Sequence, residues 1–166
     1  LPYVLEHLDG PVYMRFSRAP VPVTFGDDYQ FELGRGVVVR EGSDVALIAC
    51  GQMVAHSLDA AEDLAAGKIS ARVVNMASIK PIDEEMVVQA AKDCGCVVTV
   101  EEASIIGGLG SAVCEVLSEQ HPTPVVRVGV KDVFGESGTP DELFDKYGLS
   151  KPHIVAAVKK VIERKN

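Results

Sequence analysis

Apolar and polar residues follow two different repeats along most of this chain, and the two repeats alternate from about residue 37 to the end. Short, almost uninterrupted apolar runs are typical of strands buried on both faces of a sheet, whereas apolar residues three or four positions apart are typical of amphipathic helices. The first pattern predicts strands at 36–41, 44–51, 71–76, 96–102 and 124–130.

Predicted helices fill the gaps between these strands, and their ends carry recognisable start and stop residues. A helix over 53–66 is ended by Gly67. Asp83 stands at the N-cap position of a second helix, which ends at Gly95, and a third helix covers 109–119.

The C-terminal part has two more helix patterns. Residues 139–142 (Thr-Pro-Asp-Glu) form a capping box with proline at the first helical position, and they open a short helix that Gly148 closes. Ser150 is expected to cap the last helix, whose apolar stripe consists of Ile154, Val155, Val158, Val161 and Ile162.

This order of elements predicts an α/β fold. Right-handed crossovers between such strands produce a mostly parallel sheet that is covered on both faces. We therefore expect residues 37–166 to form a three-layer αβα sandwich around a mixed, mostly parallel sheet of about five strands. Only a short turn at Gly42-Ser43 separates the 36–41 strand from the next one, so we place it at an edge of the sheet and expect it to be antiparallel.

The region before residue 37 follows neither repeat for long. Residues 1–9 are typical of the end of a helix, and 12–16 alternates like a strand. Prolines, glycines and acids in 17–36 favour an extended linker without regular structure. A domain boundary is therefore expected near residue 36.

Composition and charge narrow the class of protein. Apolar residues make up 47% of the 166-residue chain, which is ordinary for a globular fold with a buried core. The net charge of −8 argues against nucleic acid as a partner, because binding to its backbone needs massed lysine and arginine. The lysines are scattered apart from the KKVIERK end, which we interpret as a charged helix terminus.

The sequence also indicates the cellular compartment in which the protein works. No apolar run approaches the roughly 20 residues that span a bilayer, and no signal peptide opens the sequence, so we expect a cytoplasmic protein. Its four cysteines, Cys50, Cys94, Cys96 and Cys114, are then expected to be buried thiols rather than disulfides or metal ligands.

A strand, a glycine-rich turn and a helix follow one another in 97–117, an arrangement in which backbone N–H groups can bind phosphate. The glycines at 107, 108 and 110 fit neither Gly-x-Gly-x-x-Gly nor a phosphate loop followed by lysine and serine or threonine. Glu101 and Glu102 directly precede the turn, and their charges oppose phosphate. We therefore predict that the turn lets the helix N-terminus pack closely on its own sheet or on a partner chain.

Other catalytic patterns are missing from the sequence. The four histidines lie in separate predicted elements, and neither Gly-x-Ser-x-Gly nor His-Glu-x-x-His occurs. Glu84 and Glu85 occupy the first turn of a helix, where the helix dipole alone favours acids. On its own residues, the 37–166 domain is predicted to be a non-catalytic α/β module.

Several segments, in their order along the chain, resemble transketolase-like thiamine diphosphate enzymes: DGPVYMRFSRAPVP, DVALIACGQMV, VVNMASIKPIDEE, VVTVEEASIIGGLGSAVCEVL and DVFGESGTPDELFDKYGL. The resemblance covers essentially the whole chain and is closest to the C-terminal subunit of split transketolases, in which the long chain is divided into two polypeptides. Parts of it are shared with deoxyxylulose-phosphate synthase and with the β subunits of 2-oxo acid dehydrogenases.

The resemblance implies that residues 1–18 end the pyrimidine-binding domain, 19–36 form the linker and 37–166 form the transketolase C-terminal domain. In the family, thiamine diphosphate and its Mg²⁺ lie at a dimer interface between the diphosphate-binding and pyrimidine-binding domains. The resemblance thus implies that this chain has no catalytic, cofactor-binding or metal-binding residue and is inactive alone. Its implied partners are an N-terminal, diphosphate-binding subunit or domain and a second copy in a dimer.

The resemblance also implies one substrate contact. Transketolases carry an arginine in a Ser-Arg pair that contacts the phosphate of the sugar substrate, and Ser17 and Arg18 occupy the matching positions. A guanidinium suits this role because it is planar, permanently charged and able to bind phosphate through two hydrogen bonds. A solvated linker arginine is the alternative for Arg18, and Arg15 is a second candidate for the contact. Ala103 stands where many relatives have histidine, so no role of that histidine is carried over.

Two hypotheses of different classes follow. In the first, the chain is the C-terminal portion of a transketolase of the pentose phosphate pathway, which transfers a two-carbon ketol unit between phosphorylated sugars. In the second, it is a non-catalytic assembly or regulatory module that binds a small anion at the glycine turn. The C-terminal part of a 2-oxo acid dehydrogenase β subunit or of a deoxyxylulose-phosphate synthase remains a third possibility, within the enzyme class.

Overall fold

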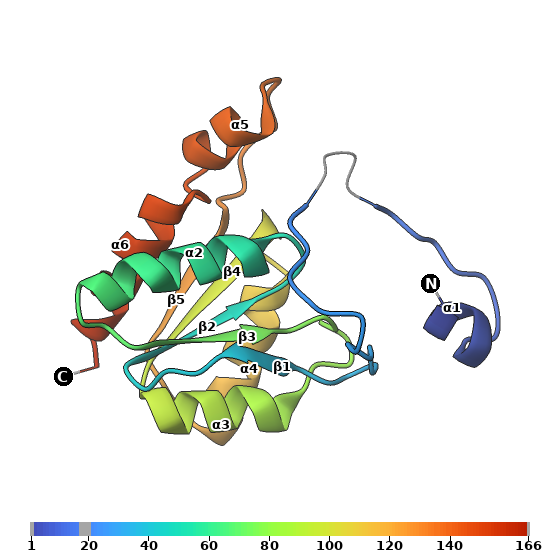
Figure 1. Cartoon of the computed structure of the whole chain (residues 1–166), viewed down its shortest axis with the longest axis horizontal. Coiled ribbons are helices and arrows are strands. Elements are labelled where there is room, and N and C mark those ends of the chain that lie inside the picture. Colours follow the sequence, from blue (N-terminus) through green and yellow to red (C-terminus); the bar gives the residue numbers. More distant parts are fainter. Residues whose placement is uncertain (1, 17–20, 166) are drawn as a thin grey trace.

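The computed structural model describes residues 2–16 and 21–165 and has an α/β fold with one sheet between helices (Figure 1). The order across the sheet is β1-β3-β2-β4-β5, with β1 antiparallel to β3 and the other pairs parallel. The predicted mixed sheet of about five strands is therefore confirmed. The strands are β1 (Val37–Arg40), β2 (Val45–Ala49), β3 (Ala71–Asn75), β4 (Val97–Ser104) and β5 (Val125–Val130).

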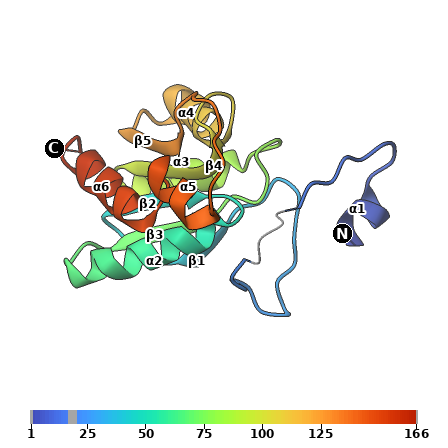
Figure 2. The same ribbon diagram turned by 90° about the horizontal axis from the view of Figure 1, so that it is seen from above.

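Helices cover both faces of the sheet, which Figure 2 shows from above. On one face, α2 (Met53–Ala66) packs against α6 (Lys151–Ile162). On the other face, α3 (Glu84–Cys94) packs against α4 (Leu109–Gln120). The result is the three-layer αβα sandwich that the sequence predicts.

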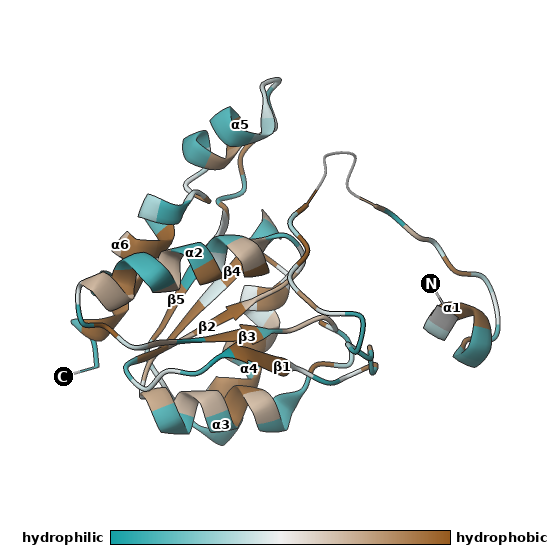
Figure 3. Cartoon of the chain, in the orientation of Figure 1, coloured by the Kyte–Doolittle hydropathy of each residue, from teal (hydrophilic) through white to brown (hydrophobic). Residues whose placement is uncertain are grey.

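The central position of β2 explains why its sequence is apolar throughout. Every residue of this strand is fully buried. Val45, Leu47 and Ala49 belong to the core beneath α2 and α6, whereas Ala46 and Ile48 belong to the core beneath α3 and α4. In Figure 3 the inner strands are accordingly brown, while hydrophilic residues lie on the outer sides of the helices. A sheet that is buried on both faces requires this pattern.

The edge strand β1 is antiparallel, as predicted, but its partner is β3 and not the next strand along the chain. The short turn after β1 crosses the start of β3, where the backbone N–H groups of Ser43 and Asp44 both donate to the Ser70 carbonyl oxygen, at 3.1 and 2.8 Å. A side chain at Gly42 would overlap with the backbone of Ala71, so glycine permits this crossing. This close approach is a tertiary feature that the hydrophobic pattern does not encode.

The predicted helix caps are mostly present. The expected capping box of α5 (Pro140–Lys146) is present, and in it the backbone N–H of Thr139 donates to the Glu142 carboxylate at 2.9 Å. Ser150 holds the N-cap position of α6, but its hydroxyl is bonded to Asp145 and His153 and makes no cap hydrogen bond. The prediction that Ser150 is the N-cap residue of α6 is therefore confirmed, although its side chain does not make the cap hydrogen bond.

The N-terminal segment lies outside the sandwich in both views (Figures 1 and 2). It contains α1 (Pro2–His7), in agreement with the helix pattern at 1–9. Residues 12–16 form no strand, which corrects the prediction from their alternation. A strand needs a neighbour for its peptide groups, and the described part of the chain places none beside these residues. None of the helices within the described ranges is long and apolar enough to cross a membrane.

Candidate functional site: an internally capped helix and an exposed apolar edge

The N-terminus of α4 already holds an anion, the carboxylate of Glu101 from β4. This side chain is only 1% exposed. One of its oxygens accepts from the backbone N–H of Leu109 and the other from that of Gly110, both at 2.8 Å. A helix N-terminus favours negative charge through its free N–H groups and its dipole. The protein's own carboxylate therefore fills the place that a phosphate occupies in nucleotide-binding turns.

The glycines of the turn make this arrangement possible. A side chain at Gly108 would overlap with the Glu101 carboxylate. A Cβ at Gly110 would lie 2.9 Å from the Thr99 hydroxyl oxygen, so the first turn of α4 packs directly on β4. Gly107 has a φ of +76°, which favours glycine. The prediction of close packing is confirmed for Gly108 and Gly110, whereas a side chain at Gly107 would meet open space. The alternative of a small anion at the turn finds no support beside a buried carboxylate.

The loop before α4 is held by short-range hydrogen bonds. The Ser111 hydroxyl accepts from the backbone N–H of Gly107 at 2.9 Å and lies 3.2 Å from the Ile105 carbonyl oxygen. The Ser104 hydroxyl accepts from the N–H of Ile106 at 3.1 Å. These hydrogen bonds hold the loop in place. The Ile106 side chain projects from its surface and is 64% exposed.

Ile106 is one of several exposed apolar residues in loops that follow the carboxyl ends of parallel strands. Ile79 follows β3, and Val133 and Phe134 follow β5, with Phe134 98% exposed. Because β3, β4 and β5 run parallel, their carboxyl ends lie at the same edge of the sheet. We call Ile79, Ile106, Val133 and Phe134 the apolar edge. Exposed large apolar residues at one edge of a sheet make that edge a candidate surface for contact with another protein part.

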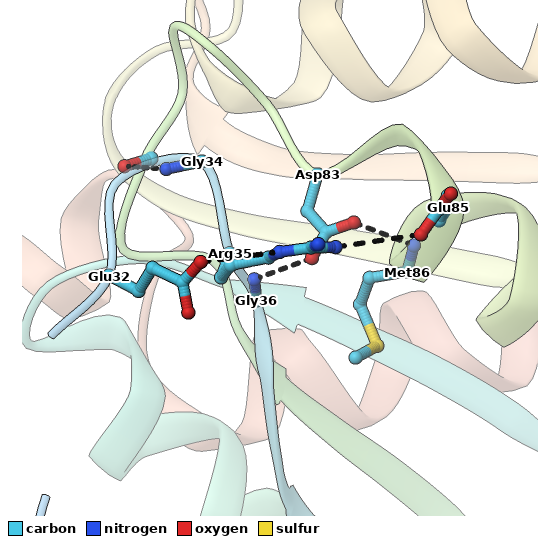
Figure 4. Close-up of polar contacts among 8 residues, drawn as sticks. Glu32, Gly34, Arg35, Gly36, Asp83, Glu85 and Met86 are labelled. Carbon is cyan, nitrogen blue, oxygen red and sulfur yellow. Dashed lines mark hydrogen bonds and ion pairs between the residues drawn. The ribbon is translucent and has the colours of Figure 1, made fainter. Parts of the chain in front are cut away.

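The end of the linker is fastened to the beginning of α3 (Figure 4). The backbone N–H of Gly36 donates to Asp83 at 2.9 Å, and the other oxygen of the same carboxylate accepts from the N–H of Met86 at 3.0 Å. Arg35 lies 3.5 Å from Glu85 in an exposed ion pair. Asp83 thus caps α3, as predicted, and also fixes where the linker enters the domain.

Replacing Asp83 with alanine is expected to lower the free energy of unfolding by about 2 kcal/mol, because two backbone N–H groups lose a charged acceptor. Urea denaturation measures this change. Glu85→Ala is the matched control, because it removes a nearby carboxylate whose only described partner is the exposed Arg35. Equal losses in the two variants would contradict the assigned role of Asp83.

The cysteines are free thiols in the structure. Burial raises the pKa of Cys50 to about 11, and the negative charges of Glu101 and Glu102 add to the effect. Burial also raises the pKa values of Cys94, Cys96 and Cys114. A thiol with a raised pKa stays neutral at physiological pH and is a poor nucleophile. None of these side chains therefore suits covalent catalysis.

The predicted substrate contact, Arg18, lies outside the described residues, as does Ser17. Arg15 is described and exposed. Within the described ranges, no group of three or more histidine, cysteine, aspartate or glutamate side chains is placed to hold a metal ion. The sequence pattern does not predict the contact between Glu101 and α4, although an acid directly before a glycine turn is a signal for it.

Fold and surface together define a class: an α/β module with an internally capped glycine turn and exposed apolar residues at one edge of its sheet. Residues 34–154 match the family "Transketolase, C-terminal domain", and the chain belongs to this family. The resemblance stated from the sequence is therefore confirmed, and the chain is a C-terminal part of a transketolase-family enzyme.

Several known proteins are similar over nearly the whole chain. The 6-deoxy-6-sulfo-D-fructose transketolase subunit SqwH of Clostridium sp. (strain MSTE9) is 50% identical over 165 residues, which are 99% of this chain and 51% of that protein. One subunit of the apulose-4-phosphate transketolase of Phocaeicola vulgatus (strain ATCC 8482) is 43% identical over 145 residues, 87% of this chain and 46% of that protein. The chain thus spans about half the length of these curated relatives.

A solved structure has nearly the same fold. It is described as "Split gene transketolase, inactive beta4 tetramer", with a TM-score of 0.92 and 57% sequence identity. The match covers 96% of this chain and 52% of that chain. The fold of the transketolase C-terminal domain is thereby established for this protein.

Proposed function

We propose that this chain is the C-terminal portion of an enzyme that transfers a two-carbon ketol unit between phosphorylated sugars, with a role in pentose phosphate metabolism. The observation that supports it most is the family match over 34–154 together with relatives that are named as transketolase subunits. Residues 1–18 and 19–36 would be the end of the pyrimidine-binding domain and the linker. Arg18 would contact the substrate phosphate.

Thiamine diphosphate with Mg²⁺ is the cofactor that the family implies, and the described residues of this chain do not fit it. They offer no group of ligands for the metal ion. The glycine turn of α4, where a diphosphate would find backbone N–H groups, is filled by Glu101. The cofactor would therefore bind in other parts of the complete enzyme, and this piece alone would be inactive.

The assembly role is supported by the apolar edge. Phe134 and Ile106 are large apolar residues that a monomer would leave in water. We infer that a diphosphate-binding N-terminal subunit or domain, or a second copy in a dimer, covers this edge. Free thiols on all four cysteines are in keeping with the reducing cytoplasm that we propose as its compartment.

Reconstitution tests this function. The subunit that contains this chain, with a complete pyrimidine-binding domain, is mixed with the diphosphate-binding subunit of the same organism. Ketol transfer between sugar phosphates is expected only from the pair, and only with thiamine diphosphate and Mg²⁺. Absence of transfer from the complete pair would overturn the proposal, and turnover of 2-oxo acids or of pyruvate with glyceraldehyde 3-phosphate would identify one of the related enzymes instead.

The apolar edge is tested in the same pair. Phe134→Asp is expected to weaken assembly, which sedimentation velocity measures, because it places a charge in an apolar contact. Ser137→Asp is the matched control, since it adds the same charge at another exposed position of the same loop. Unchanged assembly of the Phe134 variant would exclude the apolar edge as the contact surface.

A further inference from the structure

A groove runs along the outer edge of β5, on the side away from β4. β5 is the last strand of the sheet, and no other strand of the described residues lies beside this edge. The groove has a volume of about 390 Å³ and is lined by every residue from Val125 to Gly129. Alternate side chains of a strand point to opposite faces, so a groove that contacts consecutive residues follows the edge of the strand.

The hydrogen bonds between β4 and β5 show which peptide groups face the groove. The N–H of Val97 donates to the Pro124 carbonyl oxygen, and the N–H of Ile105 donates to that of Val130, both at 3.0 Å. The N–H and C=O groups of successive residues alternate between the two sides of a strand. Those of the even-numbered residues of β5 therefore point toward β4. The odd-numbered residues 125, 127 and 129 therefore direct their N–H and C=O groups into the groove.

The rim of this groove is basic, although the chain as a whole has a net charge of −8. Arg127 and Lys131 border it on the strand side. His153, Lys160 and Arg164 border it from α6 and the residues after it, and no acidic side chain is among the residues that line it. The basic C-terminal end, which the sequence indicates to be a charged helix terminus, lies beside β5 in the fold.

These charges are largely uncompensated. Among the described residues, Arg127, Lys131, Lys160 and Arg164 form no ion pair within 4.0 Å. The Arg127 guanidinium donates to the Ile105 carbonyl oxygen at 2.7 Å, which holds it in place without neutralising it. A set of unpaired cations that border one groove attracts an anionic partner.

The length of the groove distinguishes a peptide from a small anion. A strand from 125 to 129 is about 16 Å long, at roughly 3.3 Å per residue. The cations are spread along this length, so one phosphate group would contact only a few of them. An extended peptide would reach cations at several points along the groove and would also satisfy the free peptide groups of β5. Ala156 and Ala157 line the groove from α6, and their small side chains leave room for such a strand.

We propose that this basic edge groove binds an extended acidic segment of a partner polypeptide as an added strand. The backbone of the segment would pair with residues 125, 127 and 129 of β5, and its acidic side chains would face Lys131, Lys160 and Arg164. This binding site is independent of the proposed transferase function, because it requires neither the cofactor nor the rest of the enzyme.

Fluorescence anisotropy with the purified chain tests the charge preference. The probe is a fluorescein-labelled peptide of about ten residues in which glutamate alternates with valine, long enough to cover the groove at about 3.3 Å per residue. We expect saturable binding that weakens as NaCl rises from about 50 mM to about 500 mM, because salt screens exposed charges. A peptide with lysine in place of glutamate is expected not to bind, and equal binding of the two peptides would overturn the proposal.

Two neighbouring lysines provide a matched pair of variants. Lys160 lines the groove, whereas Lys159 is exposed on α6 and does not line it. Lys160→Glu is expected to weaken binding of the acidic peptide by about tenfold, and Lys159→Glu by less than about twofold, although both change the net charge equally. Equal effects would show a general attraction to the protein and would overturn the proposal.

Methylated peptides test strand addition. Two versions of the acidic probe carry N-methyl groups on alternate residues, one on the odd and one on the even positions. Strand addition uses the N–H groups of one side only, so one version is expected to lose binding and the other to keep it. Equal loss, or equal retention, would overturn the added strand.

Two further outcomes would assign the groove to another occupant. Displacement of the probe by inorganic pyrophosphate at equal concentration would show a site for small anions. A change in oligomeric state of the chain in the Lys160→Glu variant, seen by sedimentation, would show that a second copy fills the groove. Either result would overturn a partner peptide as the occupant.

Discussion

Replacing Glu101 with glutamine is expected to lower the free energy of unfolding by about 2–3 kcal/mol, although the two side chains have almost the same shape. The glutamine side chain keeps one acceptor oxygen, but its NH₂ group would face the second backbone N–H group. Both of these groups are hydrogen-bond donors, so they cannot pair. One of the two backbone N–H groups, that of Leu109 or that of Gly110, would then be buried without a partner. The loss of charge also removes a favourable interaction with the N-terminus of α4.

Urea denaturation followed by circular dichroism measures this loss. Glu102→Gln is the matched control, because it makes the same change one residue later, at an exposed side chain that is hydrogen-bonded to Gln52. We expect the control to leave stability nearly unchanged. If Glu101→Gln were as stable as the control, the carboxylate would not be what holds the α4 turn in place.

Much of the sandwich can be predicted from local patterns because its inner strands and helix stripes have strict hydrophobic repeats. β2 is apolar at every position because it is buried on both faces, and the stripe from Ile154 to Val161 places α6 on the sheet. The pairing of β1 with β3 could not be predicted in the same way, since it depends on how closely the chain passes Gly42. Such contacts between distant segments leave no periodic signal.

Local patterns fail in a different way at the candidate sites. The alternation of apolar and polar residues normally shows which side chains of a strand point inward. β4 is buried on both faces over Val97 to Glu101, so this alternation does not show where the Glu101 side chain points. Residues 12–16 alternate correctly and still form no strand, because pairing needs a partner that the described residues do not supply. The basic edge groove joins β5 with α6, which no single segment reveals.

In the complete, reconstituted enzyme, Arg18→Ala is expected to lower kcat/KM for phosphorylated sugars by about 10- to 150-fold, which corresponds to about 1.5–3 kcal/mol for hydrogen bonds to a charged group. The effect should appear mainly in KM, because the phosphate is held equally in the bound substrate and in the transition state. Arg18→Lys is expected to recover only part of the loss, since an ammonium cannot donate two parallel hydrogen bonds to phosphate.

The specificity of this effect is the decisive measurement. An unphosphorylated sugar of the same configuration lacks the group that Arg18 would bind, so its kcat/KM should be almost the same in the parent and in Arg18→Ala. Arg15→Ala is the matched control, because it removes the same charge three residues earlier. Equal losses with both sugars would show that Arg18 acts on folding or assembly and not on the phosphate. A larger loss in the Arg15 variant would assign the contact to Arg15, since only the residue that touches the phosphate can distinguish the two sugars.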